Sequence, residues 1–245
     1  MGIFRRRARQ CVELFAQSSL ARRRVRSLGT IEYVIQRRQV FEDFAVDLTL
    51  DVGANFGQFA NDLRLCYKGE LISFEPVSAV FHRLARTASR DPHWKVCQMA
   101  LGSQNITQIM NVYPGTELSS FLKTNAYCKG KFGADAATAE QQVVSVRRLD
   151  DVLDELDPDC HGKRIFLKMD TQGYDLEVFK GLGNKLKHVV AIQSEVSLIP
   201  IYEGMPHWTD SISFYERAGF AVAGLFPVTV DESRVIEYDC LMVRN

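Results

Sequence analysis

The feature that most limits the fold of this chain is the alternation of short apolar runs with segments of helical spacing. Five apolar runs rich in β-branched or aromatic residues occur between residues 48 and 195, and helix-like segments separate them. This alternation is typical of a parallel sheet with helices on both faces. We therefore expect an α/β fold with a doubly wound, mostly parallel sheet.

The expected elements follow from this pattern and from the turn residues between them. The expected strands are Leu48–Val52, Glu70–Phe74, Lys95–Ala100, Arg164–Met169, Val189–Glu195, Phe220–Phe226 and Arg234–Val243. The expected helices are 57–66, 78–88, 174–182 and 210–218. Residues 102–146 interrupt the rhythm with the alternating run Ile106–Val112, a glycine- and alanine-rich stretch near 130–139, and Val143–Val146. We interpret them as an inserted hairpin with a mobile loop, which either carries function or is an excursion without one.

Charge divides the chain into two parts. Residues 1–40 hold ten arginines and two glutamates, although the whole chain has a formal net charge of +0. Phe4, Ala8, Cys11 and Phe15 fall at helical spacing. We expect residues 1–45 to form a basic, helical preface and residues 46–245 to form one domain. The preface either packs on the body with a solvated basic face, which we favour, or contacts a polyanion or an anionic membrane surface.

The spacing of the cysteines and the length of the apolar runs indicate which cellular compartment the protein occupies and whether it binds a metal. None of the six cysteines lies in a C-x-x-C pair, and no spacing resembles a zinc site. The longest apolar run, Phe220–Phe226, is far shorter than the roughly 20 residues needed to cross a bilayer. These features predict free thiols in a cytoplasmic protein, peripheral at the inner membrane surface if the basic preface binds there, and no bound metal.

A glycine-containing loop follows the first strand, in the segment Leu50–Gly57. In a doubly wound sheet, ligands bind where such a loop joins a strand to a helix. Gly53 lets the backbone approach a ligand, Gly57 lets the helix start close to the strand, and Asn55 tolerates a left-handed backbone. The loop lacks the G-x-G-x-x-G of dinucleotide sites and the Gly-Lys-Ser/Thr of P-loops.

An acid ends the second strand, near the place expected for a ribose-binding carboxylate. Glu75 occupies that position, about 20 residues beyond the glycine loop, and Pro76 then fixes the turn. No lysine or arginine lies between Asp51 and Leu63, so a phosphate is less suited to this loop than a cationic sulfonium. Together these residues predict a nucleoside cofactor and favour one with a cationic sulfonium.

Two further acids lie at the ends of the fourth and fifth expected strands. Asp170 and Glu195 lie at the edge where the methyl group of the cofactor is expected to point, and either can act as a general base. Alternatively, Asp170 caps the next helix, and Glu195 pairs with an arginine or a backbone amide. Asp175 and Glu177 are expected to be exposed on that helix. His207, Ser119 and Ser120 are weaker candidates for contacts with the acceptor, because loop residues of these types are mostly solvated.

Several motifs, taken in order, resemble the FkbM family of S-adenosylmethionine-dependent methyltransferases. They are LDVGANFGQF at 50–59, SFEP at 73–76, QMALG at 98–102, LKMDTQGYDLEVFKG at 167–181 and SEVSLIPIYEG at 194–204. The resemblance covers residues 47–245 and implies a seven-stranded fold and O-methylation of a sugar, glycan or polyketide-like hydroxyl. It implies cofactor binding by Asp51, Gly53, Ala54, Asn55, Gly57, Glu75, Pro76, Met99 and Ala100. Thr171-Gln172 departs from the family, in which many members carry an acid before the glycine.

Three other functions compete with this interpretation. An NAD-linked oxidoreductase needs the pyrophosphate loop that the sequence lacks. A nucleic-acid methyltransferase is suggested by the arginines of the preface, but the rest of the chain is acidic and shows no aromatic-basic stacking surface. A non-catalytic nucleoside-binding protein would not need Asp170 and Glu195. The sequence leaves the acceptor and the oligomeric state undetermined.

Overall fold

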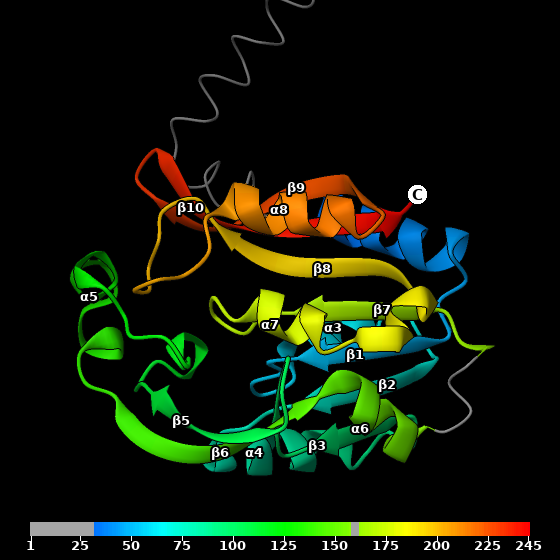
Figure 1. Ribbon diagram of the computed structural model, residues 1–245, viewed down its shortest axis with the longest axis horizontal. Helices are drawn as coiled ribbons and strands as arrows, with labels where there is room; N and C mark the ends of the chain where they lie inside the picture. Colours follow the sequence, from blue (N-terminus) through cyan, green and yellow to red (C-terminus); the bar gives the residue numbers. More distant parts are fainter. Residues whose placement is uncertain (1–31, 158–161) are drawn as a thin grey trace, which may run out of the picture.

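The computed structural model describes residues 32–157 and 162–245, and its largest element is a seven-stranded sheet (Figure 1). The strand order is β3-β2-β1-β7-β8-β10-β9, and within it β10 runs antiparallel to both β8 and β9. The other five strands, β3, β2, β1, β7 and β8, run parallel to one another. The predicted doubly wound, mostly parallel α/β sheet is therefore confirmed.

The order of elements alternates as expected. The strands of the main sheet are β1 (Leu48–Val52), β2 (Glu70–Phe74), β3 (Trp94–Cys97), β7 (Ile165–Met169), β8 (Val189–Ser197), β9 (Phe220–Asp231) and β10 (Arg234–Arg244). The α-helices are 32–43, α3 (Gln58–Leu63), α4 (Ser78–Ala88), α5 (Ala126–Phe132), α6 (Leu149–Leu156), α7 (Asp175–Lys180) and α8 (Trp208–Arg217). No helix among these described residues is both long and apolar enough for a membrane span.

Two apolar cores cover the two faces of the sheet, because successive strand residues point to opposite sides. In β7, Leu167 packs in one core with α6, α7 and α8, whereas Phe166 packs in the other. The second core also contains Ala60 of α3 and Leu84 of α4. Helices on both faces leave the carboxyl ends of the parallel strands as the open edge.

The described part of the expected N-terminal preface belongs to the second core. Val40 and Phe41 of helix 32–43 are buried, and the Phe41 ring lies 4.7 Å from that of Phe166. The side-chain amide of Gln36 donates a hydrogen bond to the Ala223 carbonyl oxygen at 2.5 Å. This helix therefore packs directly on the sheet. The helix expected at Phe4–Phe15 lies outside the described residues.

The segment between β3 and α6 forms a second, three-stranded sheet at the left of Figure 1. Its strands are β4 (Ala100–Gly102), β5 (Ile106–Val112) and β6 (Glu140–Arg148), and β5 and β6 form the predicted antiparallel hairpin. The expected mobile loop near 130–139 is instead largely helical, in α5 and the 3₁₀ turn Gly133–Ala136. Cys128 and Ala136 are fully buried in a small core that this segment shares with Ile201, Tyr202 and Ile236.

Three expected strands end two or more residues away from their observed ends. The run Lys95–Ala100 divides, because β3 ends at Cys97 and Ala100 pairs with Val146 in the second sheet. β8 continues two residues beyond Glu195, because Val196 and Ser197 pair with β10. β9 extends to Asp231 as half of a long hairpin with β10, well beyond the expected end at Phe226.

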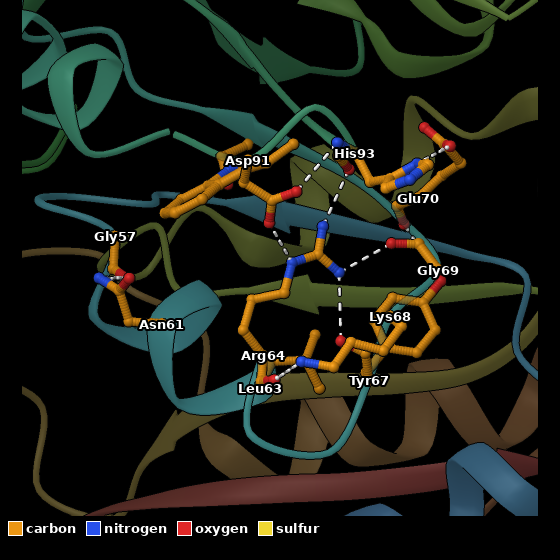
Figure 2. A network of polar contacts seen from close by, with 12 residues as sticks. Gly57, Asn61, Leu63, Arg64, Tyr67, Lys68, Gly69, Glu70, Asp91 and His93 are labelled. Atoms are coloured by element: carbon orange, nitrogen blue, oxygen red, sulfur yellow. Dashed lines mark hydrogen bonds and ion pairs between the residues drawn. The ribbon is translucent and has the colours of Figure 1, made fainter. Parts of the chain in front are cut away.

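Arg64, which follows α3, ties this helix to the beginnings of β2 and β3 (Figure 2). Its Nε donates to Asp91 at 2.6 Å, and its two Nη groups donate to the carbonyl oxygens of Gly69 at 2.7 Å and His93 at 2.9 Å. These contacts lie at the amino ends of the strands. They therefore fix the helix that follows the glycine loop from the side opposite to the open edge.

Candidate functional site

A cavity of about 430 Å³ lies at the carboxyl ends of β1, β2, β7 and β8. Its size falls within the range of about 300–1,000 Å³ that is typical of small-molecule sites. Nine of the predicted site residues line it, namely Gly53, Ala54, Asn55, Glu75, Pro76, Met99, Ala100, Asp170 and Glu195. Two predicted residues, Asp51 and Gly57, do not line it.

The loop after β1 needs glycine for close packing. A Cβ at Gly53 would lie 2.0 Å from the Asp170 carbonyl oxygen, and the residue has φ +77°. Gly53 therefore brings the loop of β1 against the end of β7. Gly57, with φ +86°, faces away from the cavity, because a Cβ there would lie 2.7 Å from the Trp94 ring. Asn55 between them has the left-handed φ of 46° that was anticipated for it.

Glu75 lines the cavity at the end of β2, and both of its carboxylate oxygens accept hydrogen bonds from the backbone. Asn55 N–H donates at 2.9 Å and Val77 N–H donates at 2.8 Å. Burial raises the pKa of this carboxyl to about 7, although the two hydrogen bonds favour the ionised form. Glu75 is thus buried, gains its charge as the pH rises through about 7, and is joined to the glycine loop by the Asn55 N–H.

Asp51 lies behind the cavity, where it pairs with a buried lysine that the sequence analysis did not single out. Lys168 Nζ lies 3.2 Å from Asp51 Oδ1 and 3.5 Å from Asp170 Oδ2, and it donates to the Gly53 carbonyl oxygen at 3.1 Å. Burial alone would lower the pKa of the ammonium, but the charges of Asp51 and Asp170 raise it above its usual value. Lys168 therefore joins β1, β7 and the glycine loop.

Asp170 and Glu195 come together on the wall of the cavity through Gln172. The Gln172 Nε2 group donates to Asp170 Oδ1 at 2.8 Å and to Glu195 Oε2 at 2.7 Å. Gln172 itself has φ 55° and accepts a hydrogen bond from the Tyr202 hydroxyl at 2.8 Å. Asp170 does not cap α7, because the residue at the N-cap position is Tyr174 and no side chain caps that helix.

Asp175, expected to be exposed, is buried beneath this pair. Its Oδ1 accepts hydrogen bonds from Thr171 N–H at 2.8 Å and from the Thr171 hydroxyl, and its Oδ2 accepts from the Ser194 hydroxyl at 2.7 Å. Burial raises the pKa of Asp175, and burial together with the charges of Asp170 and Glu237 raises that of Glu195 well above its usual value. Asp175 fixes the backbone on both sides of the acid pair.

The side of the cavity next to β8 and β10 contains polar residues that sequence reasoning missed. They are Tyr33, Arg37, Gln193 and Asp239. Burial and the charge of Asp170 raise the pKa of Asp239 to about 6, although Lys168 and Arg37 partly offset the rise. A lysine or acid within an apolar strand could have indicated Lys168 and Asp239, since such residues are rarely buried unpaired.

The three weaker candidates, Ser119, Ser120 and His207, do not lie together. Ser119 lines the cavity, and the Ser120 hydroxyl donates to the Gln172 carbonyl oxygen at 2.7 Å. His207 is exposed at the N-cap of α8, where its ring nitrogen accepts from Thr209 N–H. Among the described residues, no group of three or more His, Cys, Asp or Glu side chains is arranged to hold a metal ion.

A protein-family model and a known methyltransferase both match this chain. The model of the "Methyltransferase FkbM domain" matches residues 51–222, which is more than half of the chain. The methyltransferase sdnD of Sordaria araneosa is 27% identical over 186 residues, covering 64% of this chain and 71% of the relative.

Solved structures of low sequence identity are also similar. The magnesium protoporphyrin IX methyltransferase of Synechocystis PCC 6803, with bound SAM, has a TM-score of 0.49 and 9% identity over 91% of this chain and 81% of its own. Fibrillarin of Aeropyrum pernix, with natively bound S-adenosyl-L-methionine, has a TM-score of 0.46 and 8% identity over 80% of this chain and 66% of its own. On the family match, this chain belongs to the FkbM family of S-adenosylmethionine-dependent methyltransferases.

Proposed function

We propose that this methyltransferase transfers the methyl group of S-adenosylmethionine to a hydroxyl oxygen of a sugar, glycan or polyketide-like small molecule. The observation that carries the proposal is the acid pair on the cavity wall. Asp170 and Glu195 are bridged by the Gln172 amide and line the same cavity as Gly53 and Glu75. A hydroxyl is a weak nucleophile at neutral pH, and a positioned carboxylate can accept its proton.

The cavity residues suit the parts of the cofactor. Glu75 would accept hydrogen bonds from the ribose hydroxyls, with Pro76 fixing its turn, and Met99 and Ala100 would lie beside the adenine. The backbone of Gly53, Ala54 and Asn55 would contact the middle of the molecule, supported from behind by Asp51 and Gly57. When bound, the cofactor supplies an electrophilic methyl group on a positively charged sulfur. The nearby carboxylates favour that positive charge.

The protein's part in the reaction is to orient the acceptor and to receive a proton. The cofactor held by these residues would supply its methyl group to the acceptor oxygen and would keep the electrons of the carbon–sulfur bond. The hydroxyl proton passes to Glu195 or Asp170, so charge balances on both sides. Much of the acceleration would come from holding the two reactants in line, which the rigid ends of β7 and β8 allow.

The acids on the cavity wall also affect which kind of acceptor can bind there. Asp170, Glu195 and Asp239 would repel a nucleic-acid phosphate, which supports a small-molecule acceptor over nucleic acid. Contact with an anionic membrane surface would depend on arginines among residues 1–31, which lie outside the described residues. We propose that the protein is cytoplasmic and that these arginines allow peripheral contact with the inner membrane surface.

The test is methyl transfer to a panel of hydroxylated acceptors, using cofactor labelled in the methyl group. Mono- and oligosaccharides and hydroxylated polyketides form one arm; carboxylic acids, amines and RNA form the others. The proposal predicts label in a methyl ether, which resists mild alkali, whereas a methyl ester is hydrolysed under these conditions. Label found only in esters, amines or RNA would contradict O-methylation of a hydroxyl while leaving the cofactor assignment intact.

A further inference from the structure

Arg37, on helix 32–43, is buried on the wall of the cavity, and two of its guanidinium nitrogens have no hydrogen-bond partner among the described residues. Its side chain is 1% exposed, and its Nη1 donates to the Tyr33 hydroxyl at 3.0 Å. Within residues 32–157 and 162–245, its Nε and Nη2 groups have no hydrogen-bond acceptor, and no carboxylate forms an ion pair with it. The charge rests instead between the rings of Tyr33 and Phe59, at 4.7 and 5.1 Å.

Arg64 shows how the same chain satisfies a purely structural arginine. That guanidinium directs its donors at one carboxylate and at several backbone carbonyl oxygens, and they join three elements (Figure 2). Arg37 joins no such set of acceptors. Unpaired donors of a buried charged group are costly, so an acceptor from a bound ligand is expected beside Arg37.

Arg37 lies where a ligand of the main cavity can contact it. Arg37 and Glu75 line the same cavity. The strand order places β1, β7, β8 and β10 in turn after β2, which carries Glu75 at its end. Tyr33, the partner of Arg37, donates to Gln193 of β8 at 2.5 Å. A ligand whose ribose is held at Glu75 and which runs along this edge would therefore reach Arg37 with its other end.

We propose that Arg37 binds the carboxylate of the amino-acid moiety of the bound cofactor. A guanidinium presents a planar fork of donors that matches a carboxylate, and two of its donor groups are unpaired here. Asp239, which lines the cavity and is close enough to feel the charge of Arg37, would complement the adjacent ammonium group. A cation and an acid that line the same cavity suit a zwitterion better than a simple anion.

The assignment lies outside the part of the chain that the family model matches, which begins at residue 51. Helix 32–43 would therefore contribute a cofactor contact from outside the matched range. The inference depends on the cofactor and not on the proposed hydroxyl acceptor, so the two can fail separately.

The experiment compares two ligands that differ in the amino-acid moiety. Affinities of the full chain and its Arg37→Gln variant are measured by calorimetry for S-adenosylhomocysteine and for 5′-methylthioadenosine, which lacks the amino acid. We expect Arg37→Gln to weaken binding of S-adenosylhomocysteine by about 10- to 100-fold and to leave that of 5′-methylthioadenosine unchanged. Retained binding of the second ligand shows that the variant is folded.

Two further variants make the comparison specific. Arg37→Lys keeps the charge but not the fork, and its affinity for S-adenosylhomocysteine should lie between those of the wild type and Arg37→Gln. Arg38→Gln alters the next residue, which is exposed and pairs with Glu42 at 2.8 Å, and should change neither affinity. Equal weakening of both ligands by Arg37→Gln, or weakening of neither, would overturn the proposal.

Discussion

At the scale of single residues, the Glu75 carboxyl is a group on which cofactor affinity should depend strongly. Replacing it with glutamine removes a charged acceptor for the ribose hydroxyls. We expect Glu75→Gln to weaken binding of S-adenosylhomocysteine by about 1–3 kcal/mol, measured by calorimetry. Glu70→Gln is the matched control, because Glu70 begins the same strand and pairs with His93 at the far end. Equal affinities in the wild type and Glu75→Gln would remove Glu75 from the site.

The raised pKa of Glu75 also predicts how affinity depends on pH. The carboxyl has a pKa of about 7 in the unliganded protein, and ribose hydroxyls donate hydrogen bonds to its ionised form. Binding therefore favours loss of the proton. Affinity for S-adenosylhomocysteine should rise between about pH 6 and pH 8 and then level off. In Glu75→Gln this rise should disappear; a rise that persists there would assign the titration to another group.

Gln172 gives a test of the acid pair that needs no acceptor. A glutamate at this position would place a third carboxylate beside Asp170 and Glu195, where an amide now donates to both. Gln172→Glu should lower the free energy of unfolding at pH 8 by about 1–3 kcal/mol, and added magnesium or manganese should restore part of it. Denaturant titration with and without the metal measures this. Gln141→Glu, at an exposed position of β6, is the control and should have no comparable effect.

Most predicted site residues could be found because they follow strands that the sequence marks clearly. Glu75 and Asp170 come directly after buried apolar runs, so the topology alone places them at one edge. Lys168 and Asp239 were missed because each lies within a strand, where the pattern indicates only that a position is buried. Arg37 lies before the first expected strand, and nothing local in the sequence shows that its helix returns to the cavity.

At the scale of elements, helix 32–43 connects the fold to the site. It places Val40 and Phe41 in the core and Arg37 on the cavity wall. The predicted domain boundary at residue 45 is therefore best tested by two truncations. Removing residues 1–31 should leave the thermal unfolding transition in place, whereas removing residues 1–43 should lower its midpoint or abolish it, because core side chains are lost. The same midpoint for both shortened chains would show that this helix adds nothing to the core.

Elements were predicted well where neighbouring residues determine their ends, and poorly where residues distant in the sequence do. β1 and β2 were predicted to the residue, since each is a continuous buried run bounded by turn residues. The run Lys95–Ala100 was read as one strand because nothing local shows its division. The partner of Ala100 is Val146 of β6, more than forty residues away in the sequence. Likewise, α5 was missed because the glycines and alanines at 130–139 resemble a loop, whereas Cys128 of this helix is buried by residues from other segments.

At the scale of the whole molecule, the fold gathers acids from several strands around one cavity. Asp170, Glu195 and Asp239 come from β7, β8 and β10, and their mutual repulsion is offset by Lys168, Arg37 and Gln172. The arrangement gives a negative wall beside the place proposed for a positively charged sulfur. It follows that the chemical step, more than cofactor binding, should depend on Asp170 and Glu195.

The most direct measurement is single-turnover methylation by Asp170→Asn and Glu195→Gln, using the acceptor that the labelled-methyl panel identifies. Each amide keeps the shape of the side chain but accepts a proton poorly. We expect turnover to fall by about 10²–10⁴ in the variant that removes the base, with affinity for S-adenosylhomocysteine unchanged and no effect of a chelator on the wild type. Near-normal turnover in both variants would contradict the central claim that the acid pair takes part in the transfer.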